Sequence, residues 1–345
     1  MESPKLSICI ATFNRGKFIG ETLESIVTQV PKEVEILVVD GNSSDNSEQV
    51  ISVYAEKYPN VKYYRELTNS GVDQDYDKAI NYATGEFCWL MTDDDLLIEN
   101  SINKILQLIE MSYDLIIVNS EVWNADFTKD LHTKMLNASV DKIYRPADEN
   151  NLLGELSTCL SFIGSVIIRK SVWMERDRET YYGSLFVHVG TIFQKQLLGD
   201  VYVIAEPVLK IRYGNGMWTP RSFEIWYFKW PNLVWSFKRF SDEAKAKVVR
   251  REPWRYYFGL LKSKAMGDYT NNEFKKFIAI KKVDLDYIIA YLVSIFPAKL
   301  VNFLLVVTYS IFRRSAKYTL FDLIRSKHSS FLSVGFAKIA GINLV

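Results

Sequence analysis

Short apolar runs alternate with amphipathic stretches through the first half of the chain. The runs cover residues 6–13, 34–40, 87–91 and 114–119, with a shorter strand expected at 61–66. Continuous apolar runs of this length are typical of strands buried on both faces of a parallel sheet. Apolar residues recur at helical spacing in the intervening stretches, which are 17–30, a segment ending near Tyr58, 75–84 and 99–111. The alternation predicts an α/β fold with an open, doubly wound, mostly parallel sheet.

The pattern changes in the second half of the chain. We expect a strand at 165–170, a helix at 185–198, a strand near 201–205 and a glycine-rich polar loop at 210–221. Beyond this loop the sequence becomes helical, basic and aromatic. The change in composition predicts two domains, residues 1–220 and residues 221–345.

The most apolar stretch of the chain is residues 287–312. A membrane-spanning helix needs about 20 predominantly apolar residues, and this stretch is interrupted near its middle by Pro297 and a lysine. Three basic residues follow it: Arg313, Arg314 and Lys317. We therefore expect two shorter helices that lie in a membrane interface, so that the C-terminal region associates with a membrane. A buried helical hairpin in a soluble domain is the alternative interpretation.

Cysteine and histidine are rare in this chain. The three cysteines, Cys9, Cys88 and Cys159, lie far apart and form no CxxC pair, so a reducing compartment is expected. Three histidines are too few for a histidine-rich metal centre. The apolar run near the N-terminus is too short for a signal peptide.

The net charge of +1 conceals an asymmetry between the two halves. Residues 1–150 carry 13 Lys and Arg against 26 Asp and Glu, whereas residues 151–345 carry 29 against 15. The acidic half is expected to gather carboxylates around a cation, and the basic half to meet an anionic surface. The basic, aromatic half could also bind nucleic acid, but its apolar stretch favours lipid, and we expect no nucleic-acid partner.

Acidic residues follow two of the expected strands directly. Asp93, Asp94 and Asp95 come after the run 87–91, and Asp40 ends the run 34–40. Open α/β sheets bind ligands at the carboxyl ends of their strands, and hard divalent ions take oxygen ligands while bridging to phosphates. The pattern favours a Mg²⁺ or Mn²⁺ site that holds a diphosphate. A solvated acidic cap for the next helix is the alternative.

These motifs, in this order, resemble glycosyltransferase family 2. They are Ile10-Ala11-Thr12-Phe13-Asn14-Arg15, Val38-Val39-Asp40-Gly41-Asn42-Ser43-Ser44-Asp45, Asn69-Ser70-Gly71, Ala79-Ile80-Asn81, Ala83-Thr84-Gly85-Glu86 and Asp93-Asp94-Asp95. The resemblance covers about residues 5–100 and implies the GT-A fold. A looser likeness reaches bacterial O-antigen sugar transferases of the abequosyltransferase kind, through Phe87-Cys88-Trp89-Leu90, Cys159-Leu160-Ser161, Ile167-Ile168-Arg169-Lys170, His188-Val189 and Glu252-Pro253-Trp254.

The resemblance implies roles for the strand-end residues. The donor, a nucleoside-diphosphate sugar, would be bound by Thr12, Asn14, Arg15, Asp40, Gly71, Asp73 and Asp94. The divalent metal ion, Mn²⁺ or Mg²⁺, would be bound by Asp93 and Asp95. This chain departs from the commoner family form Asp-Ser-Asp-Asp, so an alignment that uses Asp94 and Asp95 stays open.

Catalysis in the family inverts the anomeric carbon, and a general base removes the acceptor proton. The family's Glu-Asp pair is missing here, and His188 takes the matching place. Asp177 and Glu179 are the fallback candidates. Arg212 is expected in a loop that closes over the diphosphate.

The resemblance implies an inverting, metal-dependent, hexosyltransferase-type enzyme. It would move a sugar to a hydroxyl of a polyprenyl-diphosphate-linked saccharide in bacterial surface polysaccharide or O-antigen synthesis. It would be cytoplasmic and peripheral on the inner face of the plasma membrane. Two alternatives are a catalytically inactive membrane-docked scaffold and a sugar-nucleotide pyrophosphorylase.

Overall fold

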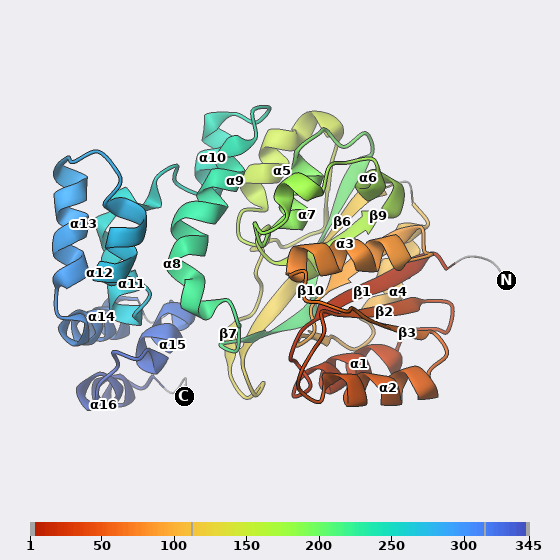
Figure 1. Ribbon diagram of the computed structural model, residues 1–345, viewed down its shortest axis with the longest axis horizontal. Coiled ribbons are helices and arrows are strands. Elements are labelled where there is room, and N and C mark those ends of the chain that lie inside the picture. The colour runs from red at the N-terminus through yellow and green to blue at the C-terminus, as the bar shows by residue number, and fades with distance from the viewer. Residues whose placement is uncertain (1–3, 112, 314, 343–345) are drawn as a thin grey trace. The chain divides into compact units, whose positions relative to one another are not determined.

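The computed structural model describes residues 4–111, 113–313 and 315–342 (Figure 1). The chain divides into two compact units. The first unit comprises residues 1–122, 133–212 and 237–248, and the second comprises 123–132, 213–236 and 249–345. Arg314, one of the basic residues that follow the apolar stretch 287–312, lies outside the described residues.

The first unit is built on one twisted sheet. Its strands are β1 (Leu6–Thr12), β2 (Glu35–Asp40), β3 (Val61–Arg65), β4 (Phe87–Met91), β5 (Leu96–Leu97), β6 (Tyr113–Asn124), β8 (Lys142–Tyr144), β9 (Val166–Arg169) and β10 (Asp200–Tyr213). The order is β3-β2-β1-β4-β9-β6-β10-β5. The four strands β3-β2-β1-β4 pair in parallel, and β9 joins them to β6 by antiparallel pairing. The α/β fold with a central parallel sheet is therefore confirmed.

Helices cover both faces of the parallel strands, as Figure 1 shows for α1 and α2 on one side and α3 on the other. The helices here are α1 (Ile19–Val27), α2 (Ser47–Lys57), α3 (Val72–Tyr82) and α4 (Ser101–Ile109). Alternate strand residues such as Ile8, Ile36 and Trp89 share one core with α1, α2 and α4. The other face of β1 and β2 packs against α3. Burial on both faces explains why these strands read as continuous apolar runs.

The rest of the first unit contains α5 (Glu149–Glu155), α6 (Lys170–Met174), α7 (Val187–Phe193) and α10 (Asp242–Val248). Helix α10 belongs to this unit, although it follows residue 220, because it packs against α5. Arg239 forms an ion pair with Glu149, and Phe240 meets the ring of Phe193 edge-on with centroids 5.9 Å apart. Aromatic packing therefore returns the chain to the first unit after residue 236.

The second unit contains β7 (Asp130–His132) and a helical region. Its helices are α8 (Ser222–Glu224), α9 (Trp230–Ser236), α11 (Tyr257–Met266), α12 (Asn271–Glu273), α13 (Leu285–Ile295), α14 (Ala298–Phe312), α15 (Lys317–Arg325) and α16 (Phe331–Ile339). Two π-helical segments, Ile225–Lys229 and Phe274–Ile278, lie between them. The core of this region is aromatic, with Phe223 and Tyr269 stacked at 4.6 Å between ring centroids.

The apolar stretch 287–312 forms two helices, α13 and α14, with Pro297 at the break and an angle of 99° between them. This confirms the expectation of two short helices. Across the described residues, none of the helices taken singly has both the length and the apolar character needed to cross a bilayer. By length and composition alone, the bent pair passes that test.

Candidate functional site

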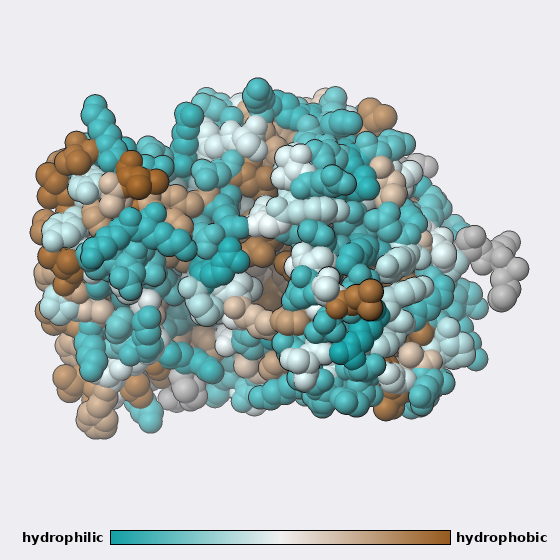
Figure 2. Space-filling view, in the orientation of Figure 1, coloured by the Kyte–Doolittle hydropathy of each residue, from teal (hydrophilic) through white to brown (hydrophobic). Residues whose placement is uncertain are grey.

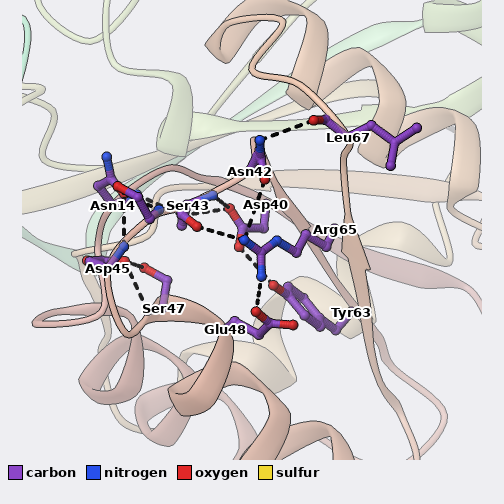
Figure 3. A network of polar contacts seen from close by, with 11 residues as sticks. Asn14, Asp40, Asn42, Ser43, Asp45, Ser47, Glu48, Tyr63, Arg65 and Leu67 are labelled. Carbon is purple, nitrogen blue, oxygen red and sulfur yellow. Dashed lines mark hydrogen bonds and ion pairs between the residues drawn. The ribbon is translucent and has the colours of Figure 1, made fainter.

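The loops after β1 and β2 are joined by side-chain hydrogen bonds to backbone (Figure 3). The amide of Asn14 donates to Ser43 Oγ at 2.8 Å, and Asn14 Oδ1 accepts from the amide of Ser44 at 2.8 Å. The amide of Arg15 donates to Ser47 Oγ at 2.9 Å. Asn14 has a φ of 55°, a left-handed conformation that asparagine tolerates better than most residues. The two strand ends thus form one polar rim, joined by hydrogen bonds.

Gly16 is required at this rim because the two loops approach closely. A Cβ atom at residue 16 would lie 2.2 Å from Asn46 Oδ1 and 2.8 Å from the amide nitrogen of Ser47. Since Ser47 also starts α2, a side chain at residue 16 would push the loop away from the helix. The glycine therefore sets the spacing between the first two strand ends.

Asp40 is fully buried at the end of β2, and both of its carboxylate oxygens are bonded (Figure 3). Oδ1 accepts from the amide of Ser43 at 2.8 Å and from its hydroxyl at 2.6 Å. Oδ2 accepts from the Tyr63 hydroxyl at 2.8 Å. Burial, reinforced by the bond to Asp40, raises the pKa of Tyr63. Arg65, on the same strand as Tyr63, donates to the carbonyl oxygen of Ser43 at 2.9 Å.

Asp93 and Asp94 share a single arginine at the end of β4. Arg15 Nε lies 3.3 Å from Asp93 Oδ1, and Arg15 Nη2 bonds to Asp94. The side chains of Asp93 and Asp94 are only 15% and 13% exposed. Burial first, and then the charge of Asp94, raise the pKa of Asp93 to about 7, although Arg15 and the Thr12 hydroxyl act in the opposite direction. Two ionised carboxylates at this place are therefore poorly solvated, and their negative charges repel each other.

Asp95 points into the protein and ties β10 to the acidic cluster. One of its oxygens accepts from the backbone amide of Arg212 at 2.7 Å, and the other from Thr92. Burial and the charge of Asp94 raise its pKa well above the ordinary value. Both oxygens of Asp95 are therefore already engaged, whereas Asp93 and Asp94 face one guanidinium.

Arg212 lies inside β10 and is 6% exposed, so the expectation that it lies in a loop that closes over the diphosphate was wrong. The strand runs from Asp200 to Tyr213, and Arg212 is one of its buried residues. Arg212 Nε donates to the carbonyl oxygen of Asp94 at 2.9 Å, and its Nη2 pairs with Glu21. The structure thus brings Arg212 next to the acidic cluster from a fixed strand.

The chemistry of these side chains is that of a hard cation site. Carboxylate oxygens are the ligands that Mg²⁺ and Mn²⁺ prefer, commonly completed by substrate phosphates. The two adjacent carboxylates with a raised pKa on Asp93 gain stability when positive charge is added. Among the described residues, however, there is no group of three or more His, Cys, Asp or Glu side chains arranged to hold a metal ion by themselves. The residues fit an ion that shares its coordination with a bound diphosphate.

Helix α3 connects the loop that ends at Gly71 with the segment before α7. It begins after Gly71, whose φ of 90° favours glycine. Asp73 is 4% exposed, and its two oxygens accept the amides of Leu185 at 2.8 Å and Val187 at 3.1 Å. One helical turn later, Asp77 accepts from Trp173, Arg178 and Tyr182. The two acids therefore hold residues 173–187 against α3.

His188 is buried in α7, in the place where a general base was expected. Its Nε2 lies 2.9 Å from the carbonyl oxygen of Leu160, so Nε2 carries the proton of the neutral ring. Its Nδ1 atom is buried without a hydrogen-bond partner among the described residues. Burial lowers the pKa of His188 to about 4. In this conformation an acceptor hydroxyl has no access to the ring.

The fallback candidates are both at the surface. Asp177 accepts from the amide of Thr180 at 3.3 Å, and its bonds to Thr180 lower its pKa. Glu179 is exposed in the next turn.

Sequence reasoning missed Tyr63, Arg65 and Asp77. The register of β2 and β3 places Asp40 beside Arg65, but a short, half-buried strand gives no sign of which residues will face a neighbouring carboxylate. The spacing of Asp73 and Asp77 by four residues was the available signal, because it puts both acids on one helix face.

Comparison with protein families finds a match for the first half of the chain. Residues 7–173 match the model of glycosyl transferase family 2. Abequosyltransferase RfbV of Salmonella typhimurium is 26% identical over 295 residues, which are 79% of this chain and 86% of that protein. The GalNAc(5)-diNAcBac-PP-undecaprenol β-1,3-glucosyltransferase of Campylobacter jejuni is 31% identical over 111 residues, 32% of this chain and 36% of that protein.

Solved structures share the fold at lower sequence identity. The crystal structure of residues 1–349 of TarS from S. aureus aligns with a TM-score of 0.55 at 18% identity, covering 92% of this chain and 89% of that one. The same protein in complex with UDP-GlcNAc aligns with a TM-score of 0.54 at 17% identity and the same coverage. A Pyrobaculum calidifontis mannosyltransferase in complex with GDP-Man and Mn²⁺ aligns with a TM-score of 0.50 at 16% identity, covering 94% and 86%.

The family match spans β1 to α6, including the strand ends that carry Asn14, Asp40 and the acidic cluster. The fold and the match confirm the resemblance inferred from the motifs. The chain therefore carries a glycosyltransferase family 2 domain with the GT-A fold, and it is a glycosyltransferase.

Proposed function

We propose that this glycosyltransferase is inverting and metal-dependent, and that it uses a nucleoside-diphosphate sugar as donor. The observation that carries the proposal is the meeting of the β1, β2 and β4 ends, which brings a polar rim next to two carboxylates that share Arg15. Related proteins support the donor class, since TarS is solved with UDP-GlcNAc and the Pyrobaculum mannosyltransferase with GDP-Man and Mn²⁺.

In this proposal the donor lies along the sheet edge, with its base toward Asp40 and its diphosphate toward the acidic cluster. Thr12, Asn14, Arg15, Gly71, Asp73 and Asp94 complete the donor contacts. Asp93 and Asp95 would hold the divalent metal ion, Asp95 through the oxygen that now accepts from Thr92. The bound ion would neutralise the negative charge on the leaving diphosphate. The fixed guanidinium of Arg212 adds positive charge at the same place.

The acceptor hydroxyl attacks the sugar carbon from the side opposite the diphosphate and needs a base. His188 remains the proposed base through Nδ1, the ring atom that its bond to Leu160 leaves unprotonated. Since that atom is buried, this role requires the segment before α7 to open when the acceptor binds. Asp177 is the competing candidate, because its carboxylate is exposed.

We further propose that the acceptor is a polyprenyl-diphosphate-linked saccharide at the cytoplasmic leaflet, in bacterial surface polysaccharide or O-antigen synthesis. The names of two relatives support it, one an abequosyltransferase and the other a glucosyltransferase of a PP-undecaprenol substrate. The pathway in which this chain works would then deliver its substrate on a lipid.

Calorimetry with UDP, GDP, CDP and TDP, with and without Mn²⁺, tests the donor site. We expect one of these nucleotides to bind and Mn²⁺ to strengthen its binding. Asp93→Ala combined with Asp95→Ala should remove the Mn²⁺ effect, and Asp94→Ala alone should identify which alignment of the acids is right. Asp40→Ala should weaken binding without altering the Mn²⁺ effect. If all four nucleotides fail to bind, the donor proposal is wrong.

A further inference from the structure

Large apolar side chains are exposed along three helices of the second unit. Residues 285, 288, 292 and 295 of α13, residues 300, 304 and 311 of α14, and residues 331, 332 and 339 of α16 are between 47% and 91% exposed. We call these ten side chains the apolar face. Figure 2 shows brown surface gathered at the left edge of the view, over α13 and α14. The spacing on α13 puts its four residues on one side of the helix.

The inward sides of the same helices bury polar residues beside apolar ones such as Val293, Val301 and Leu305. Asn302 of α14 is fully buried, and its side-chain amide donates to the carbonyl oxygens of Leu323 at 2.8 Å and Ala265 at 3.2 Å. Its Oδ1 accepts from Ser333 of α16 at 2.7 Å. Ser294 of α13 is 2% exposed. Helices of a soluble domain normally turn their polar residues outward, whereas here the outward side is apolar as well.

Positive charge accompanies the apolar face. Residues 271–345 carry eleven Lys and Arg against four Asp and Glu, a net charge of +7. Lys281, Lys282, Lys299 and Lys338 are all exposed, beside or within the helices that carry the face. An apolar surface bordered by lysines matches an anionic bilayer, which offers hydrocarbon and negative headgroups together.

The geometry of α13 and α14 suits a surface position. Only residues 296 and 297 separate the two helices, so their axes nearly meet and define one plane. Helix α14 has 15 residues, about 22 Å at 1.5 Å per residue, which is shorter than the hydrocarbon core of about 30 Å. A 99° bend lets both helices lie flat in that plane.

We propose that the apolar face is a docking surface for an anionic lipid bilayer, with α13 and α14 lying in the plane of the headgroups. This proposal deepens the proposed function, because it assigns the membrane contact to ten side chains outside the donor site. The occupant is a bilayer rather than a second copy of the chain, because two positively charged surfaces repel each other when they meet.

Flotation of the full chain with lipid vesicles tests this proposal. We expect binding to phosphatidylglycerol–phosphatidylcholine vesicles and weaker binding to pure phosphatidylcholine. The triple variant Leu292→Ser, Leu300→Ser, Leu304→Ser should lose binding to both. Replacing Lys281, Lys282 and Lys299 by Gln should weaken binding to the anionic vesicles only, by about fivefold per lysine.

A matched control removes exposed leucines elsewhere. Leu67 and Leu198 are 93% and 88% exposed in the first unit, and Leu67→Ser with Leu198→Ser should leave vesicle binding unchanged. Nucleotide binding, measured by calorimetry, should be the same in every variant. If vesicles fail to bind, or if the triple variant only dissociates a dimer seen by ultracentrifugation, the docking proposal is wrong. If vesicles bind and no nucleotide does, the proposed function fails instead.

Discussion

The guanidinium of Arg15 lies against both Asp93 and Asp94, with Arg15 Nε 3.3 Å from Asp93 Oδ1. The arginine side chain is 9% exposed. It comes from the end of β1, whereas the acids follow β4, the neighbouring strand. The positive charge of Arg15 at the end of β1 therefore balances the negative charges of Asp93 and Asp94 after β4.

Replacing Arg15 tests this balance. Arg15→Ala should destabilise the fold by about 3 kcal/mol, because it leaves partly desolvated carboxylates without their counter-charge. The free energy of unfolding in urea measures the effect. Arg15→Lys keeps the charge but cannot bond to both carboxylates through separate nitrogen atoms, and it should recover part of the stability. Equal stability of Arg15→Ala and the parent chain would contradict the pairing.

Asp93 should make stability fall as the pH rises. Its folded-state pKa of about 7 lies above the ordinary value near 3.9. The folded state therefore holds this proton more tightly, so the contribution is fully present below about pH 4 and is lost as the pH rises through 7. Up to about 4 kcal/mol is at stake. Asp93→Asn should be less sensitive to pH between 4 and 7 in urea unfolding. If the free energy of unfolding depends on pH in the same way for the parent chain and Asp93→Asn, the raised pKa of Asp93 is wrong.

Asp77 should stabilise the segment before α7. It accepts bonds from Trp173 at 2.7 Å, Arg178 at 3.2 Å and Tyr182 at 2.5 Å, and it is 5% exposed. Asp77→Ala should cost about 3 kcal/mol, because three donors lose their acceptor. Hydrogen exchange should show faster opening of residues 178–187. Glu179→Ala, at an exposed position nearby, is the control and should change neither measurement.

Protonation of His188 should lower the stability of the fold at acid pH. Its folded-state pKa of about 4 lies below the ordinary value near 6.5. The unfolded chain then binds the proton first, so stability is lost as the pH falls from 6.5 toward 4. His188→Gln should remove most of this loss, which amounts to about 3 kcal/mol.

Activity separates the two base candidates. If His188 is the base, His188→Gln should lower kcat by about 10²-fold or more while leaving nucleotide affinity unchanged. If Asp177→Ala has that effect and His188→Gln does not, the carboxylate is the base. The assay can follow donor hydrolysis by water where the acceptor is unknown.

The parallel strands were predictable because burial on both faces leaves a plain signal. The runs at 6–13 and 34–40 became β1 and β2 almost residue for residue, and Asp40 and Asp93 lie at the strand ends where the rule for open sheets puts ligands. Local pattern and tertiary environment agree in these strands.

Arg212, Asp73 and His188 could not be placed in this way. Glycines downstream of Arg212 suggested a loop, but β10 continues through Arg212, whose backbone amide donates to the distant Asp95. The hydrogen bonds of Asp73 and His188 are made with backbone groups more than 25 residues away along the chain. These groups are the amides of residues 185 and 187 for Asp73, and the carbonyl of Leu160 for His188. The boundary between the two units likewise depends on the contact of Phe240 with Phe193, and the local sequence pattern does not predict that contact.

The three cysteines of the chain are all buried. Burial raises the pKa of Cys9 well above its ordinary value and that of Cys159 to about 12. Because maleimides and spin labels react with thiolates at accessible sulfur atoms, the native protein offers these reagents almost no target. A single cysteine placed at residue 300 or 339 would therefore be labelled against a nearly blank background. The depth of its label in a bilayer could then be measured without first removing the natural thiols.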